Sequence, residues 1–275
     1  MEMLAARQEG MMLESPLLTF LALYLIVAAR YLVFAGVFHL ALWQRDPQKV
    51  KARKLTAQRP SKDLVRSEIR WSLLASLIYA FPGVLILEAW KAGGTGLYTD
   101  VNEYGWLYFF ASILLYLFLH DTYFYWTHRL MHRPGLFRLL HKVHHESRQP
   151  TPWTAFSFHP YESMVGAFII PALVFVIPLH VGALLFILTL MTLSSVINHC
   201  GFEILPDWWL RGVPGRSVIT AAHHNLHHQR YACNYGLYFR FWDKLMGTDA
   251  LETAYDFLAP RPVSRPVSET AGRSD

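Results

Sequence analysis

Three histidine clusters in this sequence have the residue type and spacing expected of metal ligands. The first has the form H-x-x-x-H, and the other two share the form H-x-x-H-H. They are His128–His132, His141–His145 and His224–His228, the last directly preceded by His223. At this histidine content, random placement predicts only about 0.04 copies of H-x-x-H-H in the chain. Two copies are therefore a strong signal.

The clusters predict which metal is bound. On a helix, side chains at i, i+3 and i+4 converge, so we expect each H-x-x-H-H cluster to offer three imidazoles to one small volume. Neutral imidazole binds zinc, copper, iron and nickel rather than magnesium or calcium. A structural zinc takes four ligands, usually including thiolates, but Cys200 and Cys233 lack C-x-x-C spacing. Eight cluster histidines therefore indicate two metal ions, and favour redox-active iron with positions open for oxygen.

A histidine that binds a metal usually donates its second ring N–H to an acceptor. Asp121, Tyr125, His128 and His132 are spaced i, i+4, i+7 and i+11, which places them on one face of a predicted helix. We therefore expect Asp121 to orient a ligand histidine. Other carboxylates near the clusters in sequence are Glu146, Glu162, Glu203 and Asp243.

The elements that must position the clusters are apolar. Hydrophobic residues make up 53% of the 275 residues and charged residues 16%, against about 25% charged in a soluble domain. A bilayer crossing needs roughly 20 apolar residues. The segments that predict spans are Pro16–Trp43, Trp71–Trp90, a stretch from Trp106 through Phe118, and Met164–Ile197. The last has about 34 residues, so we expect a hairpin with its turn near Pro178–Gly182.

Basic residues gather between Arg45 and Arg70, where nine lysines and arginines accompany three acids. This segment suits an anionic membrane leaflet better than a nucleic acid, so no nucleic-acid partner is expected. The positive-inside rule places it in the cytoplasm. The third span is expected to continue as a helix until Pro134 and Gly135, and a short helix, Leu136–His145, should follow.

We therefore predict an all-α integral membrane protein with four to five spans, including a short hairpin, and a cytoplasmic histidine-rich cap. Residues 1–105 should form N-terminal spans and the basic loop. Residues 106–250 should form the di-metal domain, and residues 251–275 a disordered tail rich in Pro, Ser and Arg.

At the histidine clusters the sequence resembles the sterol desaturase and fatty acid hydroxylase superfamily of membrane oxygenases. The resemblance covers roughly Asp121–Thr248, and its last two blocks are most similar to sterol C5 desaturases. The matching blocks are Asp121-x-x-x-Tyr125-Trp126-x-His128-Arg129, His141-Lys142-Val143-His144-His145-Glu146, Phe158-His159-Pro160, Ala221-Ala222-His223-His224-x-x-His227-His228, Asn234-Tyr235-Gly236 and Trp242-Asp243.

This resemblance implies two iron ions, molecular oxygen and oxidation of an unactivated C–H bond of a lipid to an alcohol or an alkene. It adds His199, at the end of the apolar hairpin, to the cluster histidines as a ligand. His159 and His223 are further candidates, and Glu203 stands where some fatty acid hydroxylases have another histidine. The metal set is His128, His132, His141, His144, His145, His199, His223, His224, His227 and His228. Sterol, fatty acyl, sphingolipid and carotenoid substrates all remain open.

Other interpretations compete with this one. A non-catalytic, histidine-rich metal carrier or transporter is the alternative function, although such loops are usually of low complexity. His39 and His180 are expected to be ordinary core residues, and His120 is equally compatible with either role. The chain has no glycine fingerprint for flavin or nicotinamide. Electrons should therefore come from a separate ferredoxin or small cytochrome, docking near Lys142 and Arg148.

Overall fold

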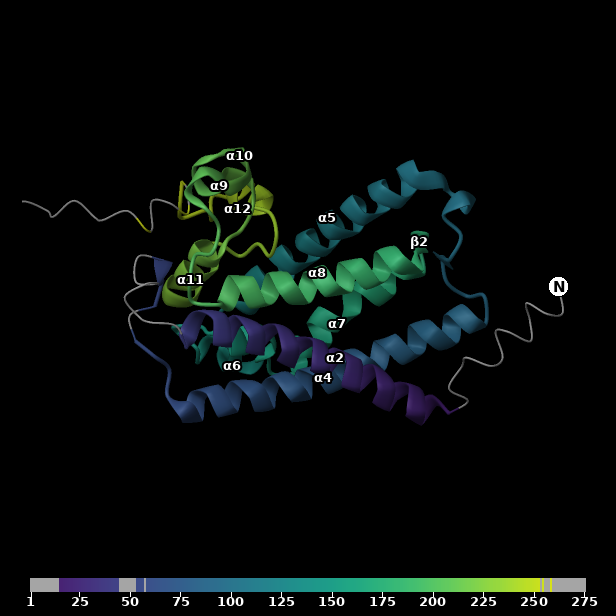
Figure 1. Ribbon diagram of the computed structural model, residues 1–275, viewed down its shortest axis with the longest axis horizontal. Helices are drawn as coiled ribbons and strands as arrows, with labels where there is room; N and C mark the ends of the chain where they lie inside the picture. Colours follow the sequence, from purple (N-terminus) through teal and green to yellow (C-terminus); the bar gives the residue numbers. More distant parts are fainter. Residues whose placement is uncertain (1–14, 45–52, 57, 253, 255–257, 259–275) are drawn as a thin grey trace, which may run out of the picture.

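The computed structural model describes residues 15–44, 53–56, 58–252, 254 and 258. Long helices run along the longest axis, and short helices of the C-terminal part gather at one end (Figure 1). The main elements are α2 (Pro16–Phe38), η1 (His39–Trp43), α4 (Lys62–Lys91), β1 (Leu97–Tyr98), η3 (Val101–Glu103), α5 (Gly105–Met131), η4 (Phe137–His141), α6 (Lys142–His145), η5 (Pro152–Phe156), α7 (Pro160–Val174), β2 (Leu179–His180), α8 (Val181–His199), α9 (Asp207–Arg211), α10 (Val213–Ser217), α11 (Ala221–Arg230) and α12 (Phe241–Leu245). Part of the predicted basic loop, residues 45–52, and nearly all of the predicted tail lie outside the described residues.

Four helical segments are long and apolar enough to cross a membrane: α2 with η1, α4, α5 and α8. The apolar helix α7 is shorter, with 15 residues. Large apolar side chains point outward along these helices, for example Leu25, which is 62% exposed, and Leu107, which is 86% exposed. Contiguous apolar surface of this kind suits lipid rather than water. The prediction of an all-α membrane fold with four to five spans is confirmed.

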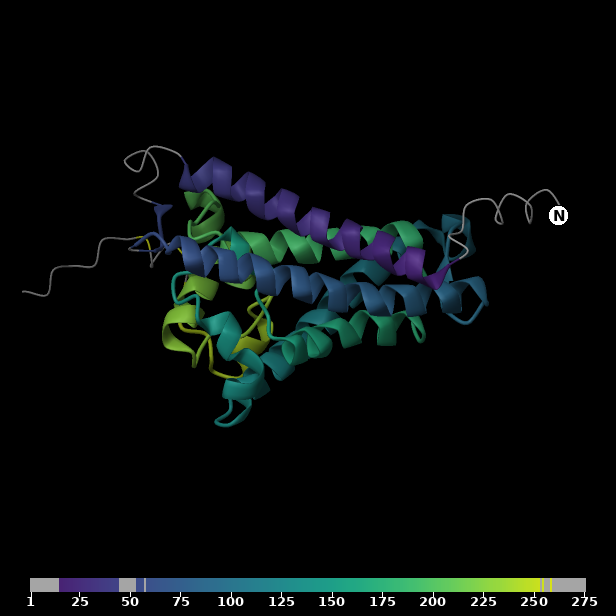
Figure 2. The ribbon, with the colours of Figure 1, turned by 90° about the horizontal axis from the view of Figure 1, so that it is seen from below.

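Helix α4 begins earlier than the sequence predicted. The helix starts at Lys62 instead of Trp71 because the Ser61 hydroxyl accepts a hydrogen bond from the backbone N–H of Leu64 at 3.1 Å. The last part of the predicted basic loop is therefore the first turns of a helix. Helices α2 and α4 pack against each other and cross, and they diverge towards the cap end (Figures 1 and 2).

The predicted hairpin is confirmed, although its first arm begins at Pro160 rather than Met164. Strand β2 follows the turn and pairs in parallel with β1, with Leu97 opposite Leu179. The hydroxyl of Tyr116 on α5 donates to the carbonyl of Ile177 at 2.6 Å, which fixes the turn against α5. His180 caps α8 by accepting the N–H of Gly182, so it is structural, as expected.

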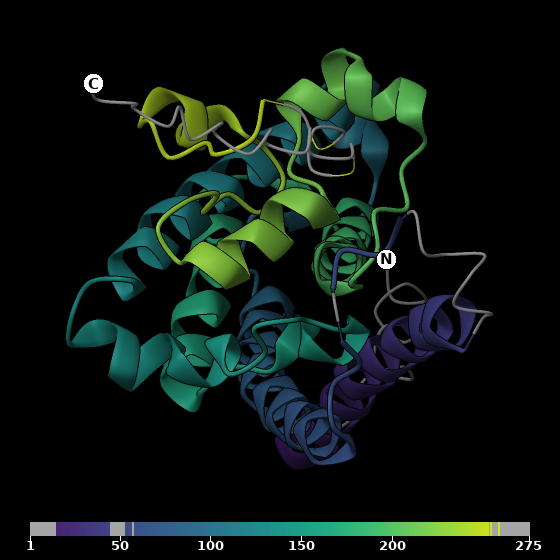
Figure 3. The ribbon, with the colours of Figure 1, turned by 90° about the vertical axis from the view of Figure 1, so that its left-hand side faces the viewer.

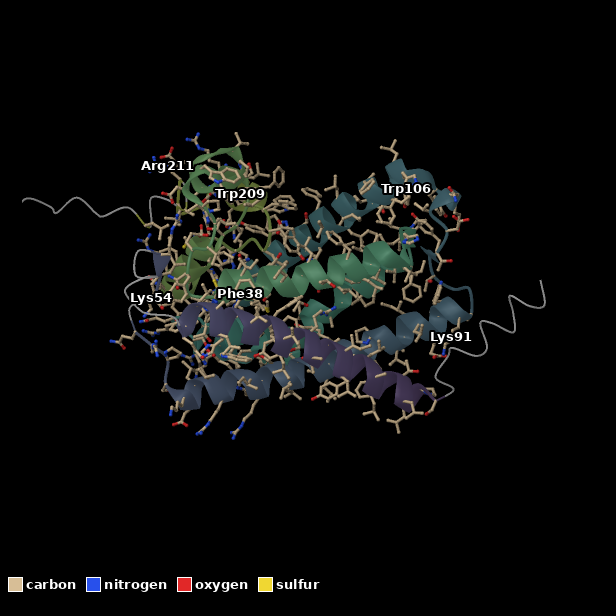
Figure 4. The ribbon with its side chains drawn as sticks, in the orientation of Figure 1. Phe38, Lys54, Lys91, Trp106, Trp209 and Arg211 are labelled. Carbon is tan, nitrogen blue, oxygen red and sulfur yellow. The ribbon has the colours of Figure 1, made fainter. Side chains whose placement is uncertain are left out.

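The short helices α9 to α12 form a cap at one end of the long helices. Seen end-on, α11 lies between the α2–α4 pair and the helices α9 and α10 (Figure 3). The segment before α4 ties this cap to the membrane part, since Leu55 N donates to Gly201 O and Glu203 N donates to Arg53 O, both at 2.9 Å. Lys54 and Arg211 lie at the cap end, and Lys91 and Trp106 lie at the opposite end (Figure 4).

Candidate metal centre

Nine of the ten predicted histidines lie in two neighbouring groups. Within each group the potential ligand atoms lie within 4.8 Å of one another. The five-histidine group is His128, His132, His141, His145 and His227. The four-histidine group is His144, His199, His224 and His228. His132 is partly buried, and the other eight side chains are buried.

Each H-x-x-H-H cluster is shared between the two groups. In the second cluster, His141 and His145 join the five-histidine group while His144 joins the other. In the third, His224 and His228 join the four-histidine group while the residue at i+3, His227, joins the five-histidine group. The expectation that each cluster offers all three rings to one volume is therefore wrong. With 3.6 residues per turn, positions i and i+4 are roughly 40° apart around the helix, whereas i+3 and i+4 are roughly 100° apart.

The ring nitrogens converge across elements that are distant in sequence. In the five-histidine group, the Nε2 atom of His128 on α5 lies 3.0 Å from that of His141. In the four-histidine group, the Nε2 atom of His199 at the end of α8 lies 3.1 Å from that of His144 and 2.8 Å from that of His224. The two groups adjoin, since the ring centroids of His145 and His228 are 4.6 Å apart.

Four of these histidines use Nδ1 to contact an oxygen acceptor, which leaves Nε2 directed into the group. The contacts are His128 to Tyr235 O at 2.9 Å, His141 to Glu162 Oε1 at 2.6 Å, His199 to Ser195 O at 2.7 Å and His227 to Cys233 O at 2.7 Å. Such contacts fix the tautomer and the orientation of a ligand ring. Glu162, not Asp121, is the carboxylate that contacts a ligand histidine among the described residues.

The electrostatics of the centre also suit a metal. Burial, and next the neighbouring histidines, hold the pKa of His141, His144, His145, His224, His227 and His228 well below the usual value. These rings are therefore neutral at neutral pH and carry lone pairs. Two adjacent sets of neutral nitrogen donors fit two ions of a metal that accepts imidazole, such as iron.

The chain is similar to known proteins over the region that holds both histidine groups. The fatty acid hydroxylase family model matches residues 113–248. The chain is 31% identical to Delta(7)-sterol 5(6)-desaturase ERG3B of Gibberella zeae over 76% of this chain and 60% of that protein. It is 27% identical to lathosterol oxidase of Rattus norvegicus over 78% of this chain and 70% of that protein. It is 30% identical to C-4 methylsterol oxidase erg25 of Schizosaccharomyces pombe over 58% and 53%, respectively.

The chain belongs to the sterol desaturase and fatty acid hydroxylase superfamily. It spans about 60% of the length of the first of these relatives. No solved structure matches it.

The superfamily motifs outside the histidines hold the loop after α11. The Asp121 carboxylate accepts the backbone N–H groups of Leu237, Tyr238 and Phe239 at 3.1, 2.7 and 3.3 Å. Asp243 accepts those of Tyr235 and Gly236, both at 2.8 Å. The predicted contact between Asp121 and a ligand histidine is therefore wrong. Asp121 and Asp243 instead hold the loop that contains Tyr235, whose carbonyl oxygen contacts His128.

Four other residues that the sequence analysis named as possible site residues lie outside both histidine groups. His223 caps α11, with its Nδ1 atom 3.1 Å from the Thr220 hydroxyl oxygen, so the structure does not bring it to the other predicted ligands. His159 caps α7. The Glu203 carboxylate accepts the backbone N–H groups of Leu205 and Ala222. His120 is buried in α5 away from the groups.

Sequence reasoning missed one buried carboxylate. Glu68 on α4 accepts hydrogen bonds from the hydroxyls of Ser147, Thr151 and Thr154 at 2.5, 3.1 and 2.9 Å. It thereby fixes the segment that follows His144 and His145. Glu68 is one of the three acids in the predicted basic loop, between Arg45 and Arg70. Two sequence features could have indicated this contact. Glu68 precedes a long apolar run, and three hydroxyl residues, Ser147, Thr151 and Thr154, follow the second histidine cluster.

Proposed function

We propose that this protein is a membrane-bound, non-haem di-iron oxygenase that oxidises an unactivated C–H bond of a lipid. The observation that supports this most is the convergence of nine histidines, nearly all buried, into two adjoining groups. The names of its relatives add a reaction class, since they are sterol desaturases and sterol oxidases. A metal carrier would need ligand side chains that can move apart to release the metal ion. Here the rings are buried, and several are fixed through their second nitrogen.

The residues of the chain prepare the centre for this chemistry. Neutral histidines supply the nitrogen donors, and the contact between Glu162 and His141 sets the direction of one ring. Iron held there would supply the activation of molecular oxygen. The apolar side chains of α5, α7 and α8 exclude water from the membrane side, which suits an apolar substrate.

The substrate we propose is a sterol-type lipid, converted to an alcohol or an alkene. The printed names of several relatives specify sterols, and the outer surface of the long helices gives the protein direct access to the bilayer. Full reduction of oxygen to water takes four electrons, and oxidation of one C–H position supplies two. Two more must come from a donor.

We propose that this donor is a separate acidic ferredoxin or small cytochrome that docks beside the five-histidine group. Exposed basic side chains lie close in sequence to the histidines of this group: Arg133, Arg138, Lys142, Arg148 and Arg230. Opposite charge on the donor would speed its encounter with this face. The excess of lysine and arginine at the cap end favours the cytoplasm as the side on which the metals lie.

Lipid analysis of cells that express the protein tests the proposal. Wild-type protein with its electron donor should yield a lipid that is one oxygen heavier or two hydrogens lighter, and purified protein should consume oxygen when that lipid is added. The His144→Ala variant should give neither result, while the His223→Gln variant should give both. A protein that binds and releases metal but consumes no oxygen with any lipid would be a carrier instead.

A further inference from the structure

Two buried polar atoms lie unpaired where α5 meets the loop after α11, outside both histidine groups. They are Nδ1 of His120 on α5 and the hydroxyl oxygen of Tyr238 in the loop after α11. Both are buried, and neither has a hydrogen-bond partner among the described residues. The His120 side chain is only 4% exposed. The ring centroids of the two residues are 5.6 Å apart, so the atoms belong to one small region.

The fold holds this pair in place. The Asp121 carboxylate accepts the backbone N–H of Tyr238 at 2.7 Å, and Asp121 directly follows His120 on α5. Tyr238 packs against an apolar cluster that includes Tyr116 on α5 and Ile187 on α8. The two polar atoms therefore lie in apolar surroundings on a fixed scaffold, where an unpaired polar group is destabilising.

The metal centre does not account for them. Several ligand histidines also have an unpaired ring nitrogen, but those rings belong to the two groups, whereas His120 and Tyr238 belong to neither. His120 precedes His128 by two helical turns, about 12 Å along the axis of α5. A molecule that contacts His120 at one end and the metal centre at the other must span at least this distance, as a membrane lipid can.

We propose that His120 and Tyr238 bind the hydroxyl group of the lipid substrate. This inference rests on the proposed function and adds to it a substrate class, an uncharged lipid alcohol. The substrate hydroxyl would donate to Nδ1 of His120 and accept from the Tyr238 O–H. A carboxylate or phosphate would bring a second negative charge close to Asp121, which disfavours it relative to an uncharged hydroxyl. In this arrangement the hydroxyl of the lipid lies at His120 and Tyr238, while the C–H bond that reacts lies at the metal centre.

Binding measurements on purified protein in detergent test this without turnover. The probes are lathosterol and octadecan-1-ol, each paired with its methyl ether, which can accept but not donate a hydrogen bond. Wild-type protein should bind at least one alcohol about tenfold more tightly than its ether. The His120→Phe variant should bring that ratio close to one, because it removes the acceptor of the alcohol proton. The Tyr238→Phe variant should weaken the binding of alcohol and ether alike, because both can accept from the Tyr238 hydroxyl. The control is Tyr116→Phe, which removes a hydroxyl that already bonds to Ile177 and should keep the ratio.

Thermal unfolding of the ligand-free variants supplies a second readout. Because the Tyr238 hydroxyl is unpaired, Tyr238→Phe should leave the melting temperature unchanged or raise it, whereas Tyr116→Phe should lower it. Wild-type protein that prefers neither alcohol, a His120→Phe variant that keeps the full preference, a Tyr238→Phe variant that binds the alcohol as tightly as wild type, or an equal loss of melting temperature in both tyrosine variants would overturn the inference. Intact alcohol preference without oxygen consumption would refute the proposed function alone.

Discussion

The Nδ1 atom of His141 lies 2.6 Å from Oε1 of Glu162, and the side chains are 2% and 7% exposed. This contact joins the first turn of α7 to the second histidine cluster. It therefore couples a hairpin helix to the metal centre. A buried carboxylate that accepts from a ligand histidine fixes the ring and raises its basicity.

Replacing Glu162 by Gln should weaken metal binding and activity by about 10- to 100-fold. The amide keeps a similar shape but removes the negative charge that faces His141. Titration of metal into the apoprotein would measure the change in affinity. The matched control is Glu146→Gln, since Glu146 is exposed and directly follows the same cluster. Wild-type metal affinity in Glu162→Gln would contradict this role.

Tyr231 ends α11 in the left-handed region, with φ 65°. Glycine adopts this conformation most easily, but the tyrosine ring packs 4.7 Å from His145 and 5.7 Å from Phe137, measured between centroids. We predict that Tyr231→Gly loses about tenfold or more in turnover while its unfolding free energy stays within about 1 kcal/mol of wild type, because strain and packing are lost together.

The Tyr231→Phe variant is the control for this prediction. It keeps the ring that contacts His145 and should retain activity. Turnover and thermal unfolding of both variants would be compared. Equal activity in Tyr231→Gly and Tyr231→Phe would show that the ring has no part in positioning His145.

The Asp121→Ala variant should be destabilised by about 2–4 kcal/mol, because backbone N–H groups of the loop after α11 would lose their acceptor. Asp121→Asn keeps one acceptor oxygen and should be less affected. Chemical unfolding measures both. If Asp121→Ala were as stable as wild type but inactive, a direct role in the chemistry would replace the structural one.

The sequence predicted local features well and long-range contacts poorly. The helix that carries Asp121 to His132 and the hairpin before His199 follow from apolar length and from proline and glycine positions. The acceptor of His128 is the carbonyl of Tyr235, which is 107 residues away, so no local spacing indicates it. The sequence pattern favours Asp121 over Glu162, because Asp121 shares a predicted helix face with His128. The contact across the fold, between Glu162 and His141, could not be predicted in this way.

The arrangement also predicts the topology of the protein in the membrane. Single cysteines at Ser61, Arg148 and Ser217, in a background without Cys200 and Cys233, should all react from the cytoplasmic side. Asn102→Cys, in the loop between α4 and α5, should react only from the other side. Arg148 is a suitable reporter because it is exposed, whereas its neighbour Ser147 is buried. Labelling of Ser217→Cys and Arg148→Cys from opposite sides would exclude a single metal centre.

The metal content of purified protein tests the central claim most directly. Wild type and His223→Gln should each contain about two iron ions per chain, the number that the two histidine groups predict. The His132→Ala, His145→Ala and His228→Ala variants should lose iron and all turnover while remaining in the membrane. One metal ion per chain in wild type, or full iron content and activity in two of these three variants, would contradict a shared di-iron centre.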